Sequence, residues 1–112
     1  MISWQRIINF KYKRAVRFFF QRLFRGWDDS ETWDLSNSLS KLILPRLKRF
    51  KELTNGHPAY ISNELWHLHL DRMIRAFEFY ASEEHWNAST EDYQKHVEGL
   101  ELFADHYNDL GW

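Results

Sequence analysis

Apolar side chains recur at steps of three and four residues through most of this 112-residue chain, and only two prolines and four glycines interrupt them. Because an α-helix repeats about every 3.6 residues, this spacing places apolar side chains on one side of a helix. No stretch alternates apolar and polar residues in the way that predicts a half-buried strand. We therefore expect an all-α fold, a compact single-domain bundle of four to five helices over residues 1–112.

The first expected helix covers residues 3–25 and ends near Gly26. Its apolar stripe consists of Trp4, Ile8, Tyr12, Ala15, Phe19 and Leu23. We expect this stripe, together with Val16, to belong to the core. Phe10, Phe18 and Phe24 lie on the basic side of the same helix. That side is expected either to pack under the acidic second half of the chain or to contact a partner.

A second helix is expected to begin at the capping residues Asp28, Asp29 and Ser30 and to run through Leu35 to Phe50. Pro45 lies inside it, and an interior proline removes a backbone hydrogen bond. We expect either a kink at Pro45 or a break with Pro45 opening a new helix. Asn55-Gly56 followed by Pro58 predicts an exit through a left-handed cap.

The third expected helix begins at Ser62 or Asn63 and ends near Ser82, and residues 82–89 are expected to form a loop. Its stripe is Trp66, Leu70, Met73, Phe77 and Tyr80. A fourth helix should start at Ser89, where Ser-Thr-Glu-Asp resembles a capping box, and continue to Gly111. In this expected packing Arg46 and His96 fall within apolar stripes, so each needs an internal polar contact, either to satisfy a core position or to line a pocket.

Charge is divided along the chain. Residues 1–51 hold 12 Lys or Arg against 4 acids, whereas residues 52–112 hold 3 against 12. The two halves could be complementary surfaces packed on each other, or the basic half could bind an anionic partner. The candidate partner-binding residues are Lys13, Arg14, Arg17, Phe18, Arg46, Lys48 and Arg49. Basic and aromatic residues in this mixture also occur in surfaces that bind nucleic acid or anionic membranes.

Candidate catalytic groups are fewer. Glu98, Glu101 and Asp105 share one side of the last expected helix and, with Glu64 or His67, could serve a magnesium-dependent enzyme acting on nucleotides. A solvated acidic helix side explains the same three residues. No phosphate-binding glycine loop, serine elbow or zinc motif occurs, and the chain has no cysteine. We therefore expect no cofactor and no resident metal, and the lack of cysteine fits a reducing compartment.

Three blocks of the chain are similar to small, uncharacterised proteins encoded by tailed bacteriophages. These blocks are "RGWDDSETWDLSNSLSKLILPRLKRFKE", "ELWHLHLDRMIRAFEFYA" and "EGLELFADHYNDLGW". The resemblance covers about residues 25–112 and includes Trp33, Pro45, Trp66, Phe77 and Gly99. It implies an accessory protein made in the host cytoplasm, and it assigns no catalytic residue.

The sequence favours a non-enzymatic binding or regulatory protein that acts on a host or phage protein, or on a nucleoprotein, through the basic and aromatic residues. A metal-dependent enzyme and a structural, self-assembling virion component are the alternatives. A homo-oligomer would fit the high content of 20 aromatic residues, because large exposed apolar patches mark interfaces. No apolar run has the length of a membrane span, so no transmembrane segment is expected.

Overall fold

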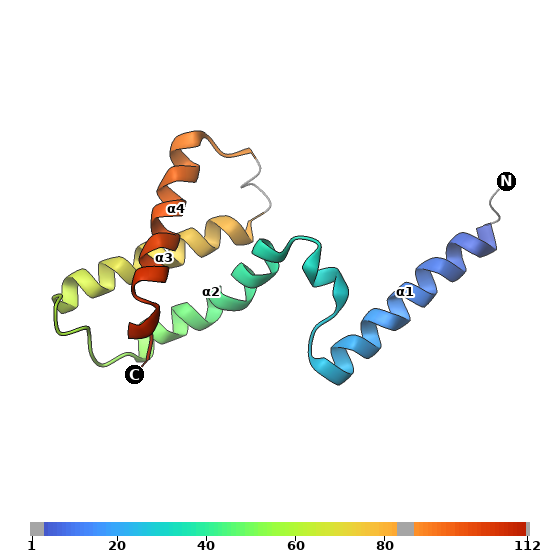
Figure 1. Cartoon of the computed structure of the whole chain (residues 1–112), viewed down its shortest axis with the longest axis horizontal. Helices are drawn as coiled ribbons and strands as arrows, with labels where there is room; N and C mark the ends of the chain where they lie inside the picture. The colour runs from blue at the N-terminus through green and yellow to red at the C-terminus, as the bar shows by residue number, and fades with distance from the viewer. Residues whose placement is uncertain (1–3, 83–86, 112) are drawn as a thin grey trace. The chain divides into compact units, whose positions relative to one another are not determined.

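The computed structural model describes residues 4–82 and 87–111, with side chains described from residue 12 onward (Figure 1). The described residues form four α-helices, α1 (Trp4–Arg25), α2 (Leu35–Leu53), α3 (Asn63–Ala81) and α4 (Thr90–Asp105). Two short 3₁₀ helices, η1 (Asp29–Thr32) and η3 (Tyr107–Asp109), follow α1 and α4. These elements confirm the all-α class. None of the described helices is both long and apolar enough to cross a membrane.

The chain divides into two compact units, residues 1–35 and residues 36–112. The N-terminal unit contains α1 and η1, and the C-terminal unit contains the body of α2 with α3, α4 and η3. The expectation of a single domain over residues 1–112 stays a prediction.

Gly26 ends α1 as expected. Its backbone adopts a φ of +86°, and its N–H donates to the carbonyl of Arg22 at 2.9 Å, which closes the last turn in the left-handed geometry that glycine permits. The left-handed cap predicted at Asn55-Gly56 is wrong, because Gly26 is the only described residue with a positive φ, and neither Asn55 nor Gly56 has one. The second helix instead ends at Leu53.

The start of α2 also differs from the prediction. Asp28 caps the 3₁₀ helix η1, and α2 begins seven residues further on, at Leu35. From there α2 is continuous through Pro45 to Leu53, so the predicted alternative of a break is not observed, while a kink stays a prediction. The buried residues of this helix are Ser40 and Leu47, and Ile43 and Leu44 pack around the same core as Leu47.

Arg46 does not take the interior position that its place in the pattern suggested. The side of α2 that is buried is centred on Leu47, which turns Arg46 outward. Its guanidinium Nη1 donates to the carbonyl of Leu42 at 2.7 Å on the exposed side of the helix. His96 is half-buried, and its ring stacks on Phe79 with centroids 4.2 Å apart.

Helix α3 supplies most of the core of the C-terminal unit. Its buried residues are Trp66, Leu70, Met73, Ile74, Ala76, Phe77 and Tyr80. Leu47 of α2 joins them, and Leu100 and Phe103 of α4 pack against the same cluster. The Phe103 ring meets Phe77 edge-on, with centroids 4.9 Å apart. The predicted α3 stripe is thus confirmed as the centre of the unit.

Helices α3 and α4 approach each other closely at Gly99. A Cβ added at Gly99 would lie 2.6 Å from the Cβ of Ala76 and 2.7 Å from the carbonyl oxygen of Arg72. Real Cβ atoms do not approach other atoms so closely, and backbone cannot yield in the way that a flexible side chain can. The small residues at positions 76 and 99 therefore set the distance between these two helices.

Helix α2 is joined to α3 by polar contacts that flank the apolar core. The ammonium of Lys51 is hydrogen-bonded to the carboxylate of Asp71, and Lys48 lies 3.4 Å from Glu78. At the other end, the amide of Asn37 donates to the carbonyls of Tyr80 and Ala81. Part of the basic first half of the chain is therefore matched with acids of the second half inside this unit.

Serine caps position the last two helices. The hydroxyl of Ser62 accepts the N–H of Leu65 at 3.1 Å, and that of Ser89 accepts the N–H of Asp92 at 3.2 Å. Both predicted starts are confirmed. Helix α4 ends at Asp105 and gives way to η3, short of the predicted end at Gly111. Of the loop expected over residues 82–89, residues 83–86 lie outside the described part.

Candidate functional site

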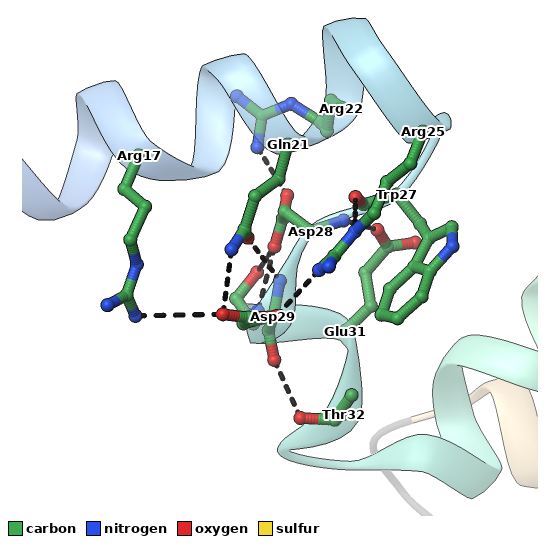
Figure 2. Close-up of polar contacts among 10 residues, drawn as sticks. Arg17, Gln21, Arg22, Arg25, Trp27, Asp28, Asp29, Glu31 and Thr32 are labelled. Atoms are coloured by element: carbon green, nitrogen blue, oxygen red, sulfur yellow. Dashed lines mark hydrogen bonds and ion pairs between the residues drawn. The ribbon is translucent and has the colours of Figure 1, made fainter.

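The turn after α1 folds back along one side of that helix (Figure 2). Asp28 begins η1, and its carboxylate accepts the N–H of Ser30 at 2.8 Å and also the Ser30 hydroxyl. In return, the carboxylate of Glu31 accepts the N–H of Asp28 at 2.7 Å. These reciprocal bonds form a capping box, which satisfies two backbone donors that the start of a helix leaves free.

Asp28 is the buried acid of this turn, with 3% of its surface exposed. A guanidinium nitrogen of Arg22 donates to it at 2.5 Å. The Ser30 hydroxyl, followed by Arg22 and the Ser30 backbone N–H, holds the pKa of Asp28 below its ordinary value, and burial opposes this effect. The carboxylate therefore stays ionised and ties the turn to α1.

Asp29 makes a second connection to α1 (Figure 2). The Gln21 amide both donates to the Asp29 carboxylate and accepts the Asp29 backbone N–H, each at 2.8 Å. Arg25 donates to the same carboxylate at 2.6 Å, and Arg17 lies 3.8 Å from it. The bond from Gln21, followed by that from Arg25, lowers the pKa of Asp29.

Rings and guanidinium groups extend this contact in both directions along α1. Arg14 lies over the ring of Trp33 at 4.4 Å, and Phe18 meets that ring edge-on with centroids 5.7 Å apart. Arg25 lies over the ring of Trp27 at 3.8 Å. Such cation–π contacts contribute about 0.5–1 kcal/mol each at exposed sites. The basic side of α1 is thus largely occupied by the turn of its own unit.

The opposite side of α1 has no such cover within the described part of the N-terminal unit. We call it the apolar side of α1 and define it as Tyr12, Ala15, Val16, Phe19, Phe20, Leu23 and Phe24. Phe24 was expected on the basic side, but its ring stacks on Phe20 and belongs to the apolar side. Its large residues are strongly exposed, from 48% at Phe20 to 69% at Tyr12 and 81% at Phe24. The expectation that Tyr12, Phe19 and Leu23 belong to a core is therefore wrong for this unit. The side chains of Trp4, Ile8 and Phe10 lie outside the described residues.

The rings on the apolar side contact one another. Phe20 stacks on Phe24 with centroids 6.1 Å apart, and Phe19 meets Phe20 edge-on at 5.6 Å. Phe20 and Phe24, together with Arg17, Gln21 and Arg25, line a shallow hollow of about 430 Å³. The N-terminal unit, taken by itself, therefore presents an apolar surface bordered by cations.

The seven predicted binding residues lie in both units. In the N-terminal unit, Arg14 and Phe18 pack on Trp33, Arg17 lies near Asp29, and Lys13 is exposed. In the C-terminal unit, Arg46 bonds to a backbone carbonyl, Lys48 lies near Glu78, and Arg49 pairs with Glu52 at 2.8 Å. Most of these cations already have a partner in their own unit. Of the exposed rings, the sequence pattern named Phe24 as packing under the second half of the chain or contacting a partner, and it assigned Tyr12 and Phe19 to a core.

A groove between α3 and α4 contains the three carboxylates considered for an enzyme. It has a volume of about 480 Å³, and Glu98, Glu101 and Asp105 line it together with Arg72, Arg75, Lys95 and His96. Among the residues that the structure describes, no three His, Asp or Glu side chains are grouped so that they could hold a metal ion. The groove has mixed charge.

A second polar cluster, which the sequence pattern missed, joins the loop before α3 to the end of the chain. The hydroxyl of Tyr60 donates to the carboxylate of Asp109 at 2.6 Å, and Nδ1 of the buried His106 lies 3.1 Å from both groups. His69 stacks on His106 with ring centroids 5.2 Å apart. A sequence pattern could have indicated only the contact between His106 and Asp109, which are three positions apart, because Tyr60 is 46 positions away from His106.

His69 is the member of this cluster with an unsatisfied polar atom. Its Nδ1 is buried and has no hydrogen-bond partner within the described residues. Burial, reinforced by the neighbouring His106 and Arg72, lowers the pKa of His69. The hydrogen bond from Tyr60 lowers the pKa of Asp109 and raises that of Tyr60 itself. The cluster fastens η3 to the body of the unit.

No family model, curated protein or solved structure matches this chain in comparisons with known proteins. The resemblance to small bacteriophage proteins stays an expectation.

Proposed function

We propose that this chain is a small, non-enzymatic accessory protein that binds another macromolecule through its N-terminal unit. The observation that carries the proposal is the apolar side of α1, where Tyr12, Phe19, Phe20, Leu23 and Phe24 are all exposed. Soluble monomers rarely expose contiguous apolar patches larger than a few hundred Å², and larger ones mark interaction sites.

The basic residues support this proposal in two ways. Arg14, Arg22 and Arg25 hold the turn against the basic side of α1. They do so through Trp33, Asp28 and Asp29, respectively. Within the N-terminal unit, the turn therefore occupies the basic side and leaves the apolar side exposed. Lys13 and Arg17 follow the edge of the apolar side, where they favour a partner of negative charge. A host or phage protein, or a nucleoprotein, is the partner class that the sequence favours.

Affinity capture from bacterial extract, with membranes retained, tests this proposal. The full-length tagged chain is compared with a variant carrying Phe19→Ser and Leu23→Ser, and with a control carrying Leu39→Ser and Leu42→Ser. The control residues are leucines of α2 with 45% and 51% exposure, so both variants lose two exposed apolar groups from a helix. We expect the α1 variant to retain at least tenfold less captured material, because each substitution removes a side chain whose burial contributes roughly 1.5–3 kcal/mol.

The α2 control should retain what the wild type retains. Equal capture by all three proteins would contradict the proposal, as would equal losses in both variants. Circular dichroism of each protein provides the check that helical content is unchanged.

A further inference from the structure

The exposed apolar side of α1, on which the binding function proposed above rests, also fits a partner that is neither a protein nor a nucleoprotein. We propose that the apolar side of α1 binds the surface of an anionic lipid bilayer, with the helix axis in the plane of the membrane. Helices of this kind combine a broad aromatic and aliphatic side with basic residues on the other side. Three features of α1 support a bilayer surface over a second helix or a second copy of the chain.

The first feature is the breadth of the apolar side. At about 100° per residue, the directions of its large side chains from Phe19 to Phe24 spread over about 140° of the helix circumference. A seam between two helices covers a narrower stripe, so a single partner helix would leave the outermost rings in water. A flat, deformable surface can cover all of them at once.

The second feature is the position of the cations. By the same helical geometry, Lys13 and Arg17 lie beside Phe20 and Phe24, along one edge of the apolar side. Long basic side chains at such edges keep their aliphatic stems on apolar surface while their charged ends reach the headgroups. Two copies of α1 packed side to side would instead bring cations against cations.

The third feature is where the acids lie. Helix α1 contains seven Lys or Arg and no Asp or Glu, so all four acids of the first 35 residues follow it in the chain. The carboxylates of Asp28 and Asp29 bond to Arg22, Gln21 and Arg25 on the polar side. With the apolar side on the lipid, these two carboxylates point toward water and away from the anionic headgroups.

Flotation of the full-length chain with lipid vesicles tests the inference. One set of vesicles contains phosphatidylcholine alone, and the other contains equal parts of phosphatidylcholine and phosphatidylserine. We expect the chain to bind the mixed vesicles at least fivefold more tightly than the neutral ones, because each cation near an anionic surface adds attraction. Phe19→Ser with Leu23→Ser should reduce binding by about tenfold or more, since apolar burial supplies most of the affinity.

Matched variants separate the contribution of charge to vesicle binding from that of the apolar side of α1. Lys13→Gln should weaken binding to the mixed vesicles by about fivefold and leave binding to neutral vesicles unchanged. The control with Leu39→Ser and Leu42→Ser should float as the wild type does. Loss of binding in this control as well would overturn the assignment to α1.

Three further outcomes would contradict binding to lipid. If the wild type stays unbound with both vesicle types while the capture from extract still depends on Phe19 and Leu23, the lipid inference is wrong and the binding function stands. If light scattering shows a dimer that Phe19→Ser and Leu23→Ser convert to a monomer, a second copy is the occupant, and the inference is overturned. If neither vesicles nor extract respond to the variant, both proposals fail.

Discussion

Gly99 shows how a single missing side chain sets the geometry of the C-terminal unit. The Ala76 Cβ and the Arg72 carbonyl oxygen lie only 2.6 and 2.7 Å from the place that a Cβ of residue 99 would take. Alanine is favoured over glycine inside helices by about 1 kcal/mol, so the local preference and the packing act in opposite directions. Overpacking a close helix contact costs about 1–3 kcal/mol, and here the obstructing atoms include backbone.

We therefore expect Gly99→Ala to lower the free energy of unfolding by about 1–2 kcal/mol, as measured by urea denaturation. Gly56→Ala is the matched control, because nothing lies within 4 Å of a Cβ built there. That control should change stability by less than about 0.5 kcal/mol. An increase in stability for Gly99→Ala would show that the helices separate without cost.

His69 has a buried ring nitrogen, Nδ1, without a hydrogen-bond partner among the residues that the structure describes. Leaving a buried polar group unsatisfied costs about 1–3 kcal/mol. Replacing His69 by Phe removes that nitrogen and keeps an aromatic ring against His106. We expect His69→Phe to raise the free energy of unfolding at neutral pH by about 1 kcal/mol, measured by urea denaturation.

The same substitution should change the pH dependence of stability. The pKa of His69 is lowered in the folded chain from its ordinary 6.5. The contribution of this group is therefore complete above pH 6.5 and is lost as pH falls through the lower, folded-state pKa. Wild-type stability should decline over that interval on acidification, and His69→Phe should decline less. Identical slopes for the two proteins would refute this role, since His96, whose pKa is also lowered, is present in both.

At the scale of an element, the turn over residues 26–33 depends on its acids more than on apolar contacts. Asp28 connects three groups, the Ser30 backbone, the Ser30 hydroxyl and Arg22. We expect Asp28→Ala to accelerate amide hydrogen exchange at Ser30 by about tenfold, because the cap of η1 is lost. NMR-detected exchange measures this residue by residue.

A second capping residue provides the control. Ser89→Ala removes the cap of α4, so it should accelerate exchange at Asp92 and leave exchange at Ser30 unchanged.

Lowering the pH should accelerate exchange in the turn over residues 26–33 in the same way as Asp28→Ala does. The pKa values of Asp28 and Asp29 are lowered from 3.8, so their contribution is complete above that pH and is lost as pH falls through the folded-state values. Unchanged exchange at Ser30 in the Asp28 variant would contradict the capping role.

At the scale of the whole molecule, the sequence predicted features that depend on neighbouring residues. The helical stripe of α3 and the starts at Ser62 and Ser89 follow from periodicity and capping chemistry, which act within a few residues. The end of α1 at Gly26 is of the same kind. These features are independent of how distant segments meet.

Features that depend on distant segments were predicted poorly. The pattern of α1 identifies two sides but does not say which one the chain covers. The turn takes the basic side because Asp28 and Asp29, two and three residues after Gly26, bond to Arg22, Gln21 and Arg25. Arg46 is exposed because the buried side of α2 is centred one residue further on, at Leu47. The contact of Tyr60 with His106 has no local pattern at all. Propensity and periodicity cannot rank such alternatives, since packing decides between them.

Because its carboxylate bonds to both Gln21 and Arg25, Asp29 affects how the charge of the chain is presented at its surface. One carboxylate holds Gln21 and Arg25 and attracts Arg17, so a single neutralising change would release two guanidinium groups together. An ordinary surface acid lowers the net charge by one, whereas Asp29 also orients the guanidinium groups of Arg25 and Arg17. The retention of the protein on a cation exchanger is therefore more sensitive to position 29 than its net charge of -1 suggests.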